Sequence, residues 1–437
     1  MKRFRYAPII FLLLLLSAGQ IYALEQPEKI LSLEDSIKWA MTNNQDLLLL
    51  AEKKYIYEQK IKEADSYFYP KLVLSGAYTR LDVSTPTTLP PNLGGSTLPV
   101  GVSNHYATRV SVNQYLFTGG YLINQHMIAE TQLEEVRKDD EGVKRRVVLD
   151  VASKFYDVLY QQQLLEIYKE YQAQLNNYLD IARRKADPRV YETGLWEMEA
   201  ANLEALLSKT EEKADLALIA FNKSVGFELN SKVKLVGDLK VSGDEGQQDI
   251  NTYVAKALDC SPELQRLTLV DTEIQHEISQ AFSERYPTIV LGADYERSGL
   301  DFDLEGRNWT ATLAINYPLF NGWLSWARVR QMRGELKRSS LMAVQQRDNL
   351  TLQVQQSYSH YLRAGKNLNN LGKNKDLAQK TLDAVVESYK NSRANCTEVL
   401  TILRRFLDTK MLYLDESYEY TLSEIELKVV TGIDLSK

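Results

Sequence analysis

The sequence predicts an α+β membrane protein built by internal duplication, with two β-strands and two long α-helices in each half. Three observations support this prediction. A strand–loop–strand segment occurs twice, a long proline-free tract follows each copy, and the strands alternate apolar residues with small or polar ones. Alternation of this kind gives a strand one apolar and one polar face, as in strands that cross a membrane.

The duplication is clearest at the strands. Residues 66–80 read SYFYPKLVLSGAYTR and residues 283–297 read SERYPTIVLGADYER, and the two align at an offset of 217. Residues 110–120, VSVNQYLFTGG, align with residues 313–323, LAINYPLFNGW, at an offset of 203. Insertions between matched segments fall in loops, so each copy is predicted to be a β-hairpin.

The predicted hairpins span residues 70–117 and 287–320. Their connectors, Leu81–Asn104 and Ser298–Arg307, differ in length, and this difference accounts for the two offsets. A connector of this kind should be a loop at the end of the hairpin away from the helices.

A helix is predicted before each hairpin. The first spans residues 32–67, and Ser32 with Asp35 is expected to form its N-terminal cap. Its counterpart in the second half runs from about residue 249 to residue 285. Both helices stop shortly before a proline, which cannot continue a helix.

The tracts after the hairpins are predicted to be helices of unusual length. Neither Tyr121–Lys185 nor Leu324–Lys437 contains proline, and apolar residues recur in both at the three- and four-residue spacing of coiled coils. At 1.5 Å per residue, about 65 helical residues span about 100 Å. Turn residues interrupt the helical pattern at 186–191 and at 392–397, so each half should end in a helical hairpin with its tip there.

The predicted domains follow from these boundaries. Residues 1–23 carry a positive start, an apolar run of eight and a small-residue end, which is typical of a secretory signal peptide. The first structural repeat then covers residues 24–228 and the second covers residues 249–437. A polar linker over residues 229–248 joins them.

Composition argues against an enzyme and against a nucleic-acid partner. The formal net charge is −6, and loss of the basic signal peptide makes it more negative. The four histidines stand alone, without metal-ligand spacing, and no phosphate loop or nucleophile elbow is present. We therefore expect no cofactor and no metal. Cys260 and Cys396 lie in different parts of the repeat, so two free thiols are expected.

The strands indicate where the chain meets lipid. One face of each predicted strand is apolar and ends in an aromatic residue: Tyr78, Tyr106, Tyr295 and Trp309. Membrane strands carry such aromatic girdles at the lipid interface. A half-buried sheet in a soluble protein is the alternative that alternation alone allows. If the four strands do enter a membrane, their open edges are not tolerated there, so other copies of the chain must complete the sheet.

The order of these segments resembles the TolC-like outer-membrane efflux protein family over essentially the whole mature chain. The residues that carry the resemblance are YPKLVLSGAY and YPTIVLGADY, the strand ends YLFTGG and YPLFNGW, and the segment YKNSRANCTEVL at 389–400. The resemblance implies a homotrimer with a 12-stranded outer-membrane β-barrel, continued by a long α-helical coiled-coil tunnel in the periplasm. It implies localisation in the outer membrane of a Gram-negative bacterium.

The resemblance also implies a function and partners. The chain would be the exit duct of a tripartite efflux or type I secretion system. It would receive substrates from an inner-membrane pump of the resistance-nodulation-division, ABC or major facilitator type, through a periplasmic adaptor (membrane fusion) protein. The alternative is a non-conducting trimeric coiled-coil tether or adhesin of the envelope. Polar residues that face inward from the strands favour the duct, because a tether has no use for them.

The resemblance implies a pore constriction at the tips. Tyr389 matches the tyrosine of the family pattern, and Glu398 matches its acidic residue. The chain departs from the pattern at Ala394, where the family has an arginine, with Arg393 next to it, and at Thr401, which replaces a second acidic residue. Glu192 is the first-half counterpart of Glu398. In a trimer, these carboxylates would focus negative potential and favour cations.

Overall fold

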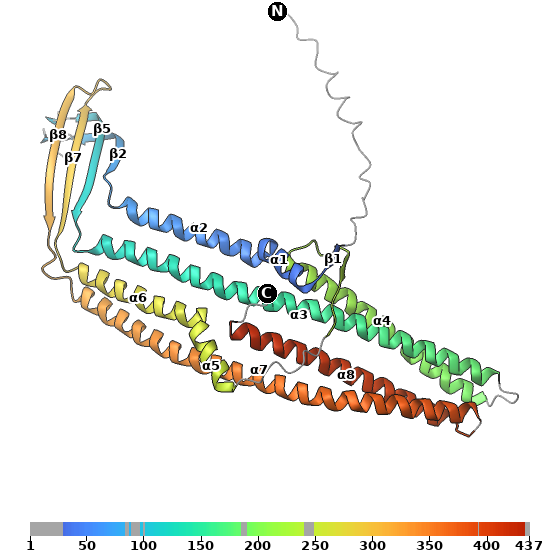
Figure 1. Cartoon of the computed structure of the whole chain (residues 1–437). Helices are drawn as coiled ribbons and strands as arrows, with labels where there is room; N and C mark the ends of the chain where they lie inside the picture. Colours follow the sequence, from blue (N-terminus) through green and yellow to red (C-terminus); the bar gives the residue numbers. More distant parts are fainter. Residues whose placement is uncertain are drawn as a thin grey trace, which may run out of the picture.

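The computed structural model describes residues 29–83, 87–88, 97–98, 101–184, 190–239, 249–391 and 393–432. The chain is elongated, with a β-sheet at one end and helices along the rest of its length (Figure 1). The predicted signal peptide lies outside the described residues. So do most of the first hairpin connector, residues 186–189 of the tip predicted at 186–191, and part of the predicted linker.

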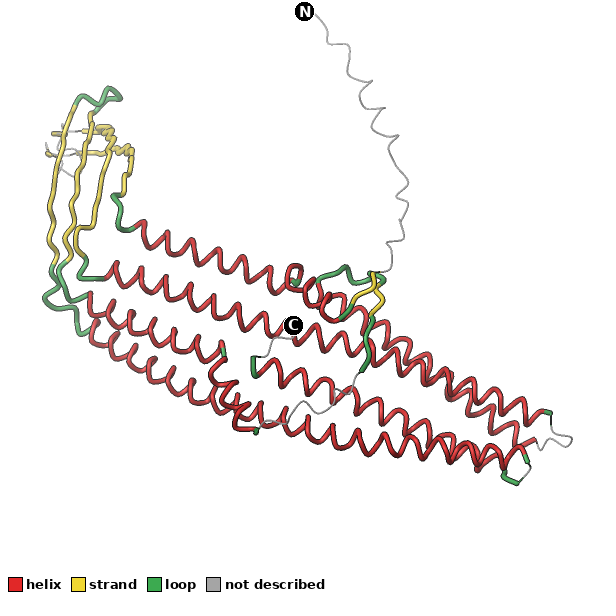
Figure 2. Tube along the Cα trace, viewed as in Figure 1, coloured by secondary structure: helices red, strands yellow, loops and turns green. Residues whose placement is uncertain are grey.

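The elements follow one another in a repeating order (Figure 2). They are β1 (Lys29–Leu31), α1 (Leu33–Asn43), α2 (Gln45–Ser66), β2 (Lys71–Val83), β3 (Thr87–Thr88), β4 (Thr97–Leu98), β5 (Gly101–Phe117), α3 (Tyr121–Arg183), α4 (Val190–Val225), β6 (Val233–Leu235), α5 (Ile250–Cys260), α6 (Pro262–Ser283), β7 (Thr288–Gly299), β8 (Gly306–Asn316), α7 (Leu324–Lys390) and α8 (Cys396–Val430). Each half thus contains two short-linked helices, a strand pair and two long helices.

The helix predicted over residues 32–67 is in fact two helices. Its start is as expected, because Ser32 and Asp35 form a capping box. The break falls at Asn44, whose side-chain oxygen accepts hydrogen bonds from the backbone N–H groups of Asp46 and Leu47 and so begins α2. The Asn44 amide donates to the carbonyl of Ser224 on α4 at 2.6 Å. The cap and this tertiary contact override the continuous helical pattern.

The helix predicted over residues 249–285 is broken in the same way. Ser261 lies between α5 and α6, and its hydroxyl accepts a hydrogen bond from the Leu264 N–H at 3.3 Å. Pro262 occupies the first turn of α6, where a missing N–H costs nothing. The prediction of one helix was wrong because Ser-Pro is a better helix start than a helix interior.

The sheet has the strand order β2–β5–β7–β8, and all neighbours are antiparallel. Tyr78 pairs with Tyr106, and Tyr295 with Trp309, so each hairpin places its two aromatic residues side by side. The second hairpin ends at Asn316 rather than 320, before Pro318, which has no N–H to donate. Within the described residues, β2 and β8 each have one edge that no strand covers.

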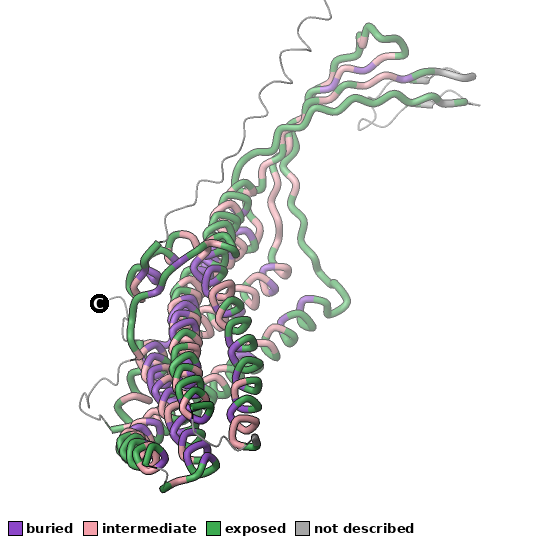
Figure 3. The backbone as a smooth tube through the Cα atoms, turned by 90° about the vertical axis from the view of Figure 1, so that its right-hand side faces the viewer, coloured by how far each residue is buried: buried purple, intermediate pink, exposed green. Residues whose placement is uncertain are grey.

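The long helices define two regions of the body. Beside the sheet, α2 and α6 run along α3, and α6 also lies along α7. Farther away, α3 pairs with α4 and α7 pairs with α8, which forms two helical hairpins that end together (Figure 1). Buried residues follow the helix faces that meet inside this body (Figure 3). The cores are aliphatic and aromatic, as the predicted spacing requires.

The segment predicted as a polar linker is not wholly irregular. Its first part contains β6, which pairs in parallel with β1 from the start of the chain. Val233 and Leu235 are buried with Leu31 in the core around Phe155 and Phe221. The first part of the predicted linker therefore belongs to the folded body. The segment is mostly polar, and the strand spacing of its two apolar residues, Val233 and Leu235, was not recognised.

Three further findings concern the cysteines, membrane-spanning helices and metal sites. Both cysteines are free thiols, as expected, with Cys396 buried and Cys260 partly so. Among the described residues, no helix is both long and apolar enough to span a membrane. The same residues contain no cluster of three or more His, Cys, Asp or Glu side chains that could hold a metal ion.

We predict that Gly226→Ala destabilises the protein strongly. Gly226 ends α4 with a φ of 87°, and a Cβ there would lie 2.3 Å from the carbonyl oxygen of Asn43. The strain of the left-handed conformation alone costs about 1–2 kcal/mol, and the clash adds to it. The thermal midpoint of the purified protein should fall. Gly334→Ala is the control, because a Cβ inside α7 meets no atom within 4 Å and should raise the midpoint slightly. Equal midpoints for the two variants would contradict the prediction.

Candidate functional site at the helix tips

The candidate site is the end of the body farthest from the sheet, where the two helical hairpins finish (Figure 1). In the second hairpin α7 ends at Lys390 and α8 begins at Cys396. The predicted tip of 392–397 was therefore too long, because Asn395 caps α8 and draws Cys396 and Thr397 into the helix. In the first hairpin, α3 ends at Arg183 and α4 begins at Val190.

Glu398 occupies the first turn of α8 and forms a capping box with Asn395. The Glu398 N–H donates to Asn395 Oδ1 at 2.9 Å, and the Asn395 N–H donates to Glu398 Oε2 at 3.1 Å. A carboxylate is stabilised at a helix N-terminus by the helix dipole. The Glu398 side chain is nevertheless exposed, so its charge is available at the surface of the tip.

The other predicted residues of the second tip differ in their surroundings. Arg393 is exposed, and its backbone N–H donates to the carbonyl of Ser388 at 2.8 Å. Thr401 is exposed one turn into α8, where its hydroxyl donates to the carbonyl of Thr397 at 2.7 Å. Tyr389 is only 1% exposed and packs in the core between the helices. Within one chain, Tyr389 therefore holds the helices together rather than facing solvent.

The two tips are in contact. The thiol of Cys396 lies 3.8 Å from the backbone carbonyl oxygen of Glu192, in hydrogen-bonding geometry. The Glu192 side chain is half-buried in the first turn of α4. Trp196, one turn further along α4, is completely buried beside Tyr178 in the core that also contains Tyr389. The structure thus brings the Glu192 and Glu398 helix starts to the same end of the molecule.

A polar network that the sequence did not predict lies a few turns from the tips. Glu199 on α4 is 7% exposed and accepts hydrogen bonds from the Tyr171 hydroxyl on α3 at 2.8 Å and from Arg404 Nε on α8 at 2.9 Å. A second guanidinium N–H of Arg404 donates to the other carboxylate oxygen of Glu199. Because this pairing is bidentate, it fixes the angle between the two groups. One carboxylate therefore joins both helical hairpins.

The pKa values of the network follow from these contacts. Burial alone would raise the pKa of Glu199, but the hydrogen bonds from Arg404 and Tyr171 outweigh it, so this pKa lies below its usual value. Burial and the hydrogen bond to Glu199 raise the pKa of the Tyr171 hydroxyl. Glu199 is therefore ionised, and Tyr171 is neutral, at neutral pH.

The sequence did contain a signal for this network. Glu199 lies on the same face of α4 as Trp196, Leu203 and Leu207, which are all buried. An acidic residue inside an apolar stripe needs a partner, because an unpaired buried charge is costly. The partner could not be found from sequence, since Arg404 belongs to the other half of the chain.

The predicted membrane-interface aromatics lie together on the sheet. The Tyr78 and Tyr106 rings are 5.1 Å apart between centroids. Tyr78, Tyr295 and Trp309 are exposed, and Trp309 is 75% exposed. Leucine, valine and isoleucine side chains continue this apolar face toward the helices: Leu72, Leu74, Val110, Leu291, Leu313 and Ile315.

The opposite face of the sheet is polar. Ser75, Arg109, Glu296 and Asn308 follow one another across the four strands in register. Arg109 Nε donates to Glu296 Oε2 at 2.8 Å, so the two charges form an ion pair on this face. The sheet therefore separates an apolar face from a charged one, as a sheet between lipid and water requires.

We predict that Arg404→Ala destabilises the tip region by about 1–3 kcal/mol, because it leaves the buried Glu199 carboxylate without its strongest partner. Arg405→Ala is the matched control, since Arg405 is the exposed neighbour on the same helix. Thermal unfolding monitored by tryptophan fluorescence is suitable, because Trp196 reports on this core.

The stability of the wild type and that of Arg404→Ala should depend differently on pH. In the wild type, the lowered pKa of Glu199 contributes stability at neutral pH that is lost as the pH falls through that pKa. In Arg404→Ala, burial dominates and raises the pKa, so protonation relieves the penalty. The difference in thermal midpoint between the wild type and Arg404→Ala should therefore become smaller as the pH falls from about 7 to about 5. A gap that stays constant would show that Glu199 is not the group left unpaired.

Comparisons with known proteins agree with this geometry. The profile of the "Outer membrane efflux protein" family matches residues 37–188 and 253–433. No curated protein matches the sequence significantly. The solved structure of CusC is similar, with 17% identity, a TM-score of 0.76 and coverage of 92% of each chain. The CmeC outer membrane channel of Campylobacter jejuni has 13% identity and a TM-score of 0.78 over 92% of this chain and 85% of its own.

The MtrE outer membrane channel of Neisseria gonorrhoeae, in its open state, has 13% identity and a TM-score of 0.75 over 92% of this chain and 89% of its own. At such identities these structures show a shared fold. The family profile covers both halves of the chain and is that of channel proteins rather than enzymes. The chain belongs to the outer membrane efflux protein family, and it is an efflux channel of the Gram-negative outer membrane that extends into the periplasm.

Proposed function

We propose that three copies of the chain form the exit duct of a tripartite efflux or type I secretion system. Each copy would add four strands to one 12-stranded barrel in the outer membrane, and its helices would build a coiled-coil tunnel in the periplasm. The two repeats, residues 24–228 and 249–437, would each supply one strand hairpin and one helical hairpin. Substrates would enter from an inner-membrane pump and its periplasmic adaptor, and the adaptor would bind near the tips.

One observation carries this proposal: a four-stranded sheet with an apolar face, a polar face and two unpaired edges, among the described strands. Unpaired backbone groups at β2 and β8 are costly in hydrocarbon, so they need partner strands. Joining β8 of one copy to β2 of the next satisfies both edges, and closure gives a ring. The polar face with Arg109 and Glu296 would then line water.

The alternative function is a non-conducting trimeric tether or adhesin. The polar face of the sheet disfavours it, because a tether needs no charged surface enclosed by lipid-facing strands. Paired Arg109 and Glu296 on that face make sense beside a water-filled space.

We predict that the mature protein, extracted from membranes in detergent, is a trimer that forms channels in a planar lipid bilayer. The uncovered edges of β2 and β8 find partner strands only when copies of the chain assemble. Light scattering with detergent correction gives the mass, and bilayer recordings give the conductance. A stable monomer that remains in solution without detergent would contradict the assembly, and a trimer that never conducts would favour the tether.

We further propose that Glu398 and Glu192 line the narrow periplasmic end of this duct, with Arg393 and Thr401 exposed nearby and Tyr389 packed behind them. Three copies of each carboxylate would focus negative potential there. Glu398 has a second role in capping α8, so its charge must be removed without losing the cap. Glutamine can accept the same hydrogen bond from the Asn395 N–H, which makes Glu398→Gln more informative than an alanine variant.

We predict that Glu398→Gln weakens the cation preference of the channel and its block by a trivalent cation such as hexamminecobalt(III). Glu192→Gln should act in the same direction with a smaller effect, because Glu192 is half-buried. Glu204→Gln is the control, an exposed glutamate of α4 more than three turns from the tip. Reversal potentials and block constants from single-channel recordings provide the test. If Glu398→Gln and Glu204→Gln behave alike, the constriction lies elsewhere.

A further inference from the structure

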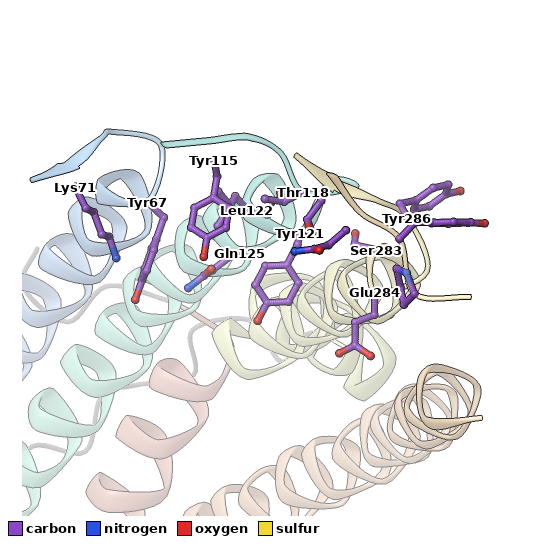
Figure 4. Close-up of a pocket in the computed structure, with 14 residues that line it drawn as sticks. Tyr67, Lys71, Tyr115, Thr118, Tyr121, Leu122, Gln125, Ser283, Glu284 and Tyr286 are labelled. Carbon is purple, nitrogen blue, oxygen red and sulfur yellow. Dashed lines mark hydrogen bonds between the residues drawn. The ribbon is translucent and has the colours of Figure 1, made fainter. Parts of the chain in front are cut away.

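A hollow of about 720 Å³ lies where the sheet meets the helices (Figure 4). Five tyrosines from different elements line it, and they are Tyr67, Tyr115, Tyr121, Tyr286 and Tyr317. Four of these are between 40% and 59% exposed, so their rings are available to a ligand. The rings of Tyr67, Tyr115 and Tyr121 are directed to the same side, beside Gln125 and Glu284 (Figure 4).

The hollow lies on the polar face of the sheet. Lys71, Tyr115 and Thr288 line it. Side chains of a strand alternate between its two faces, so residues an even number of positions apart share a face. Lys71 therefore shares a face with Ser75, Tyr115 with Arg109, and Thr288 with Glu296. A girdle of tyrosines at the lipid surface would lie on the other face, with Tyr78 and Trp309. The strand register turns Tyr115 away from that lipid side, and the other four tyrosines line the same hollow, so contact with lipid does not explain them.

The charges around the hollow favour an anion. Glu284, which lines it, is already paired with Arg328. The Lys71 ammonium lies 4.2 Å from the centroid of the Tyr67 ring, and no carboxylate of the described residues lies within ion-pairing distance of it. Glu284 is thus neutralised, whereas the charge of Lys71 is available to a ligand. The Gln125 side chain adds a hydrogen-bonding group on the same side.

We propose that this hollow binds aromatic organic anions, with their rings against the tyrosines and their acidic group at Lys71. Tyrosines supply rigid, amphipathic contact area at low entropic cost, and the polar side chains among them can orient a small molecule in a concave site. The volume of the hollow lies within the range of sites that bind drug-sized molecules, about 300–1,000 Å³. The inference rests on the proposed duct, because the polar face then lines the route of export, and it assigns one class of exported substrate.

The test uses the trimer in lipid nanodiscs and two probes that differ in charge. Naphthalene-2-sulfonate is the anion, and naphthalen-2-yl-trimethylammonium is the cation. Isothermal titration should show saturable binding of the anion and weaker binding of the cation. Lys71→Gln should reduce the affinity for the anion about fivefold, the upper range for one exposed ion pair. Tyr121→Leu should weaken both probes, because it removes a ring from the lining.

Lys60→Gln is the matched control. Lys60 is an exposed lysine of α2 that also lies over a tyrosine ring, 4.0 Å from the centroid of Tyr57, but it is outside the hollow. It should leave both affinities unchanged. Equal losses in Lys60→Gln and Lys71→Gln, tighter binding of the cation, or no saturable binding in nanodiscs would each overturn the proposal.

Bilayer recordings on the same preparation separate this proposal from the duct itself. We expect the sulfonate to reduce the current through the wild type and to do so less in Lys71→Gln. If the protein conducts but the sulfonate neither binds nor reduces the current, the inferred anion site is wrong and the proposed duct is unaffected. A protein that does not conduct loses the proposed function, whatever the titrations show.

Discussion

The unsatisfied hydrogen bonds at the two sheet edges dominate the physics of this chain. In water, open edges are tolerated, because water hydrogen-bonds with the exposed backbone groups. In hydrocarbon each unpaired N–H or C=O group costs free energy, because no hydrogen-bonding partner is present. The strands β2 and β8 present such edges along 13 and 11 residues. The apolar face of the sheet is stable in contact with lipid, but its open edges are not tolerated there. A single copy of the sheet therefore cannot enter the membrane alone. Assembly is therefore a condition for insertion in the proposed trimer.

The helical body has a complementary constraint, because its long helices must be held together along their whole length. The helices α3 and α7 have 63 and 67 residues, and most of their stability comes from packing of their apolar faces, as in other folded proteins. The cores do this in separate patches rather than one continuous interior. Beside the core near the tips, polar contacts also fix how the helices align. Tyr160 donates to Asp415 at 2.5 Å, and Lys410 donates to Glu170 at 2.6 Å, and both pairs join α3 to α8.

Sequence periodicity predicted the elements but not their interruptions. The repeated strands, the long tracts and the tips could be found because each follows a local pattern of spacing or turn residues. The break at Ser261 had a local signal, since Ser-Pro favours a helix start over a helix interior, but the apolar spacing that continues through it concealed that signal. The break at Asn44 could not be located, because the apolar pattern continues through it and the deciding contact comes from Ser224 on α4. The pairing of β6 with β1 was missed for the same reason, since the partners are about 200 residues apart.

The tip shows most clearly what sequence comparison supplies and what it leaves out. The family pattern pointed to Glu398, Glu192 and Tyr389, yet it could not tell that Tyr389 is buried within the chain or that Glu398 caps a helix. Nor could it identify the Glu199–Arg404 pair, which joins the two helical hairpins.

In the proposed trimer these two sets of charges have opposite effects. Like carboxylates gathered at the opening repel one another and favour separation of the tips, and their repulsion weakens with salt. The bidentate pair lies away from the opening, where Glu199 is buried, and it holds α4 to α8 within each chain. The repulsion would therefore act between chains, while the ion pair keeps each chain's two hairpins together. Tips with this distribution of charge would part as intact double hairpins, one from each chain, rather than as single helices.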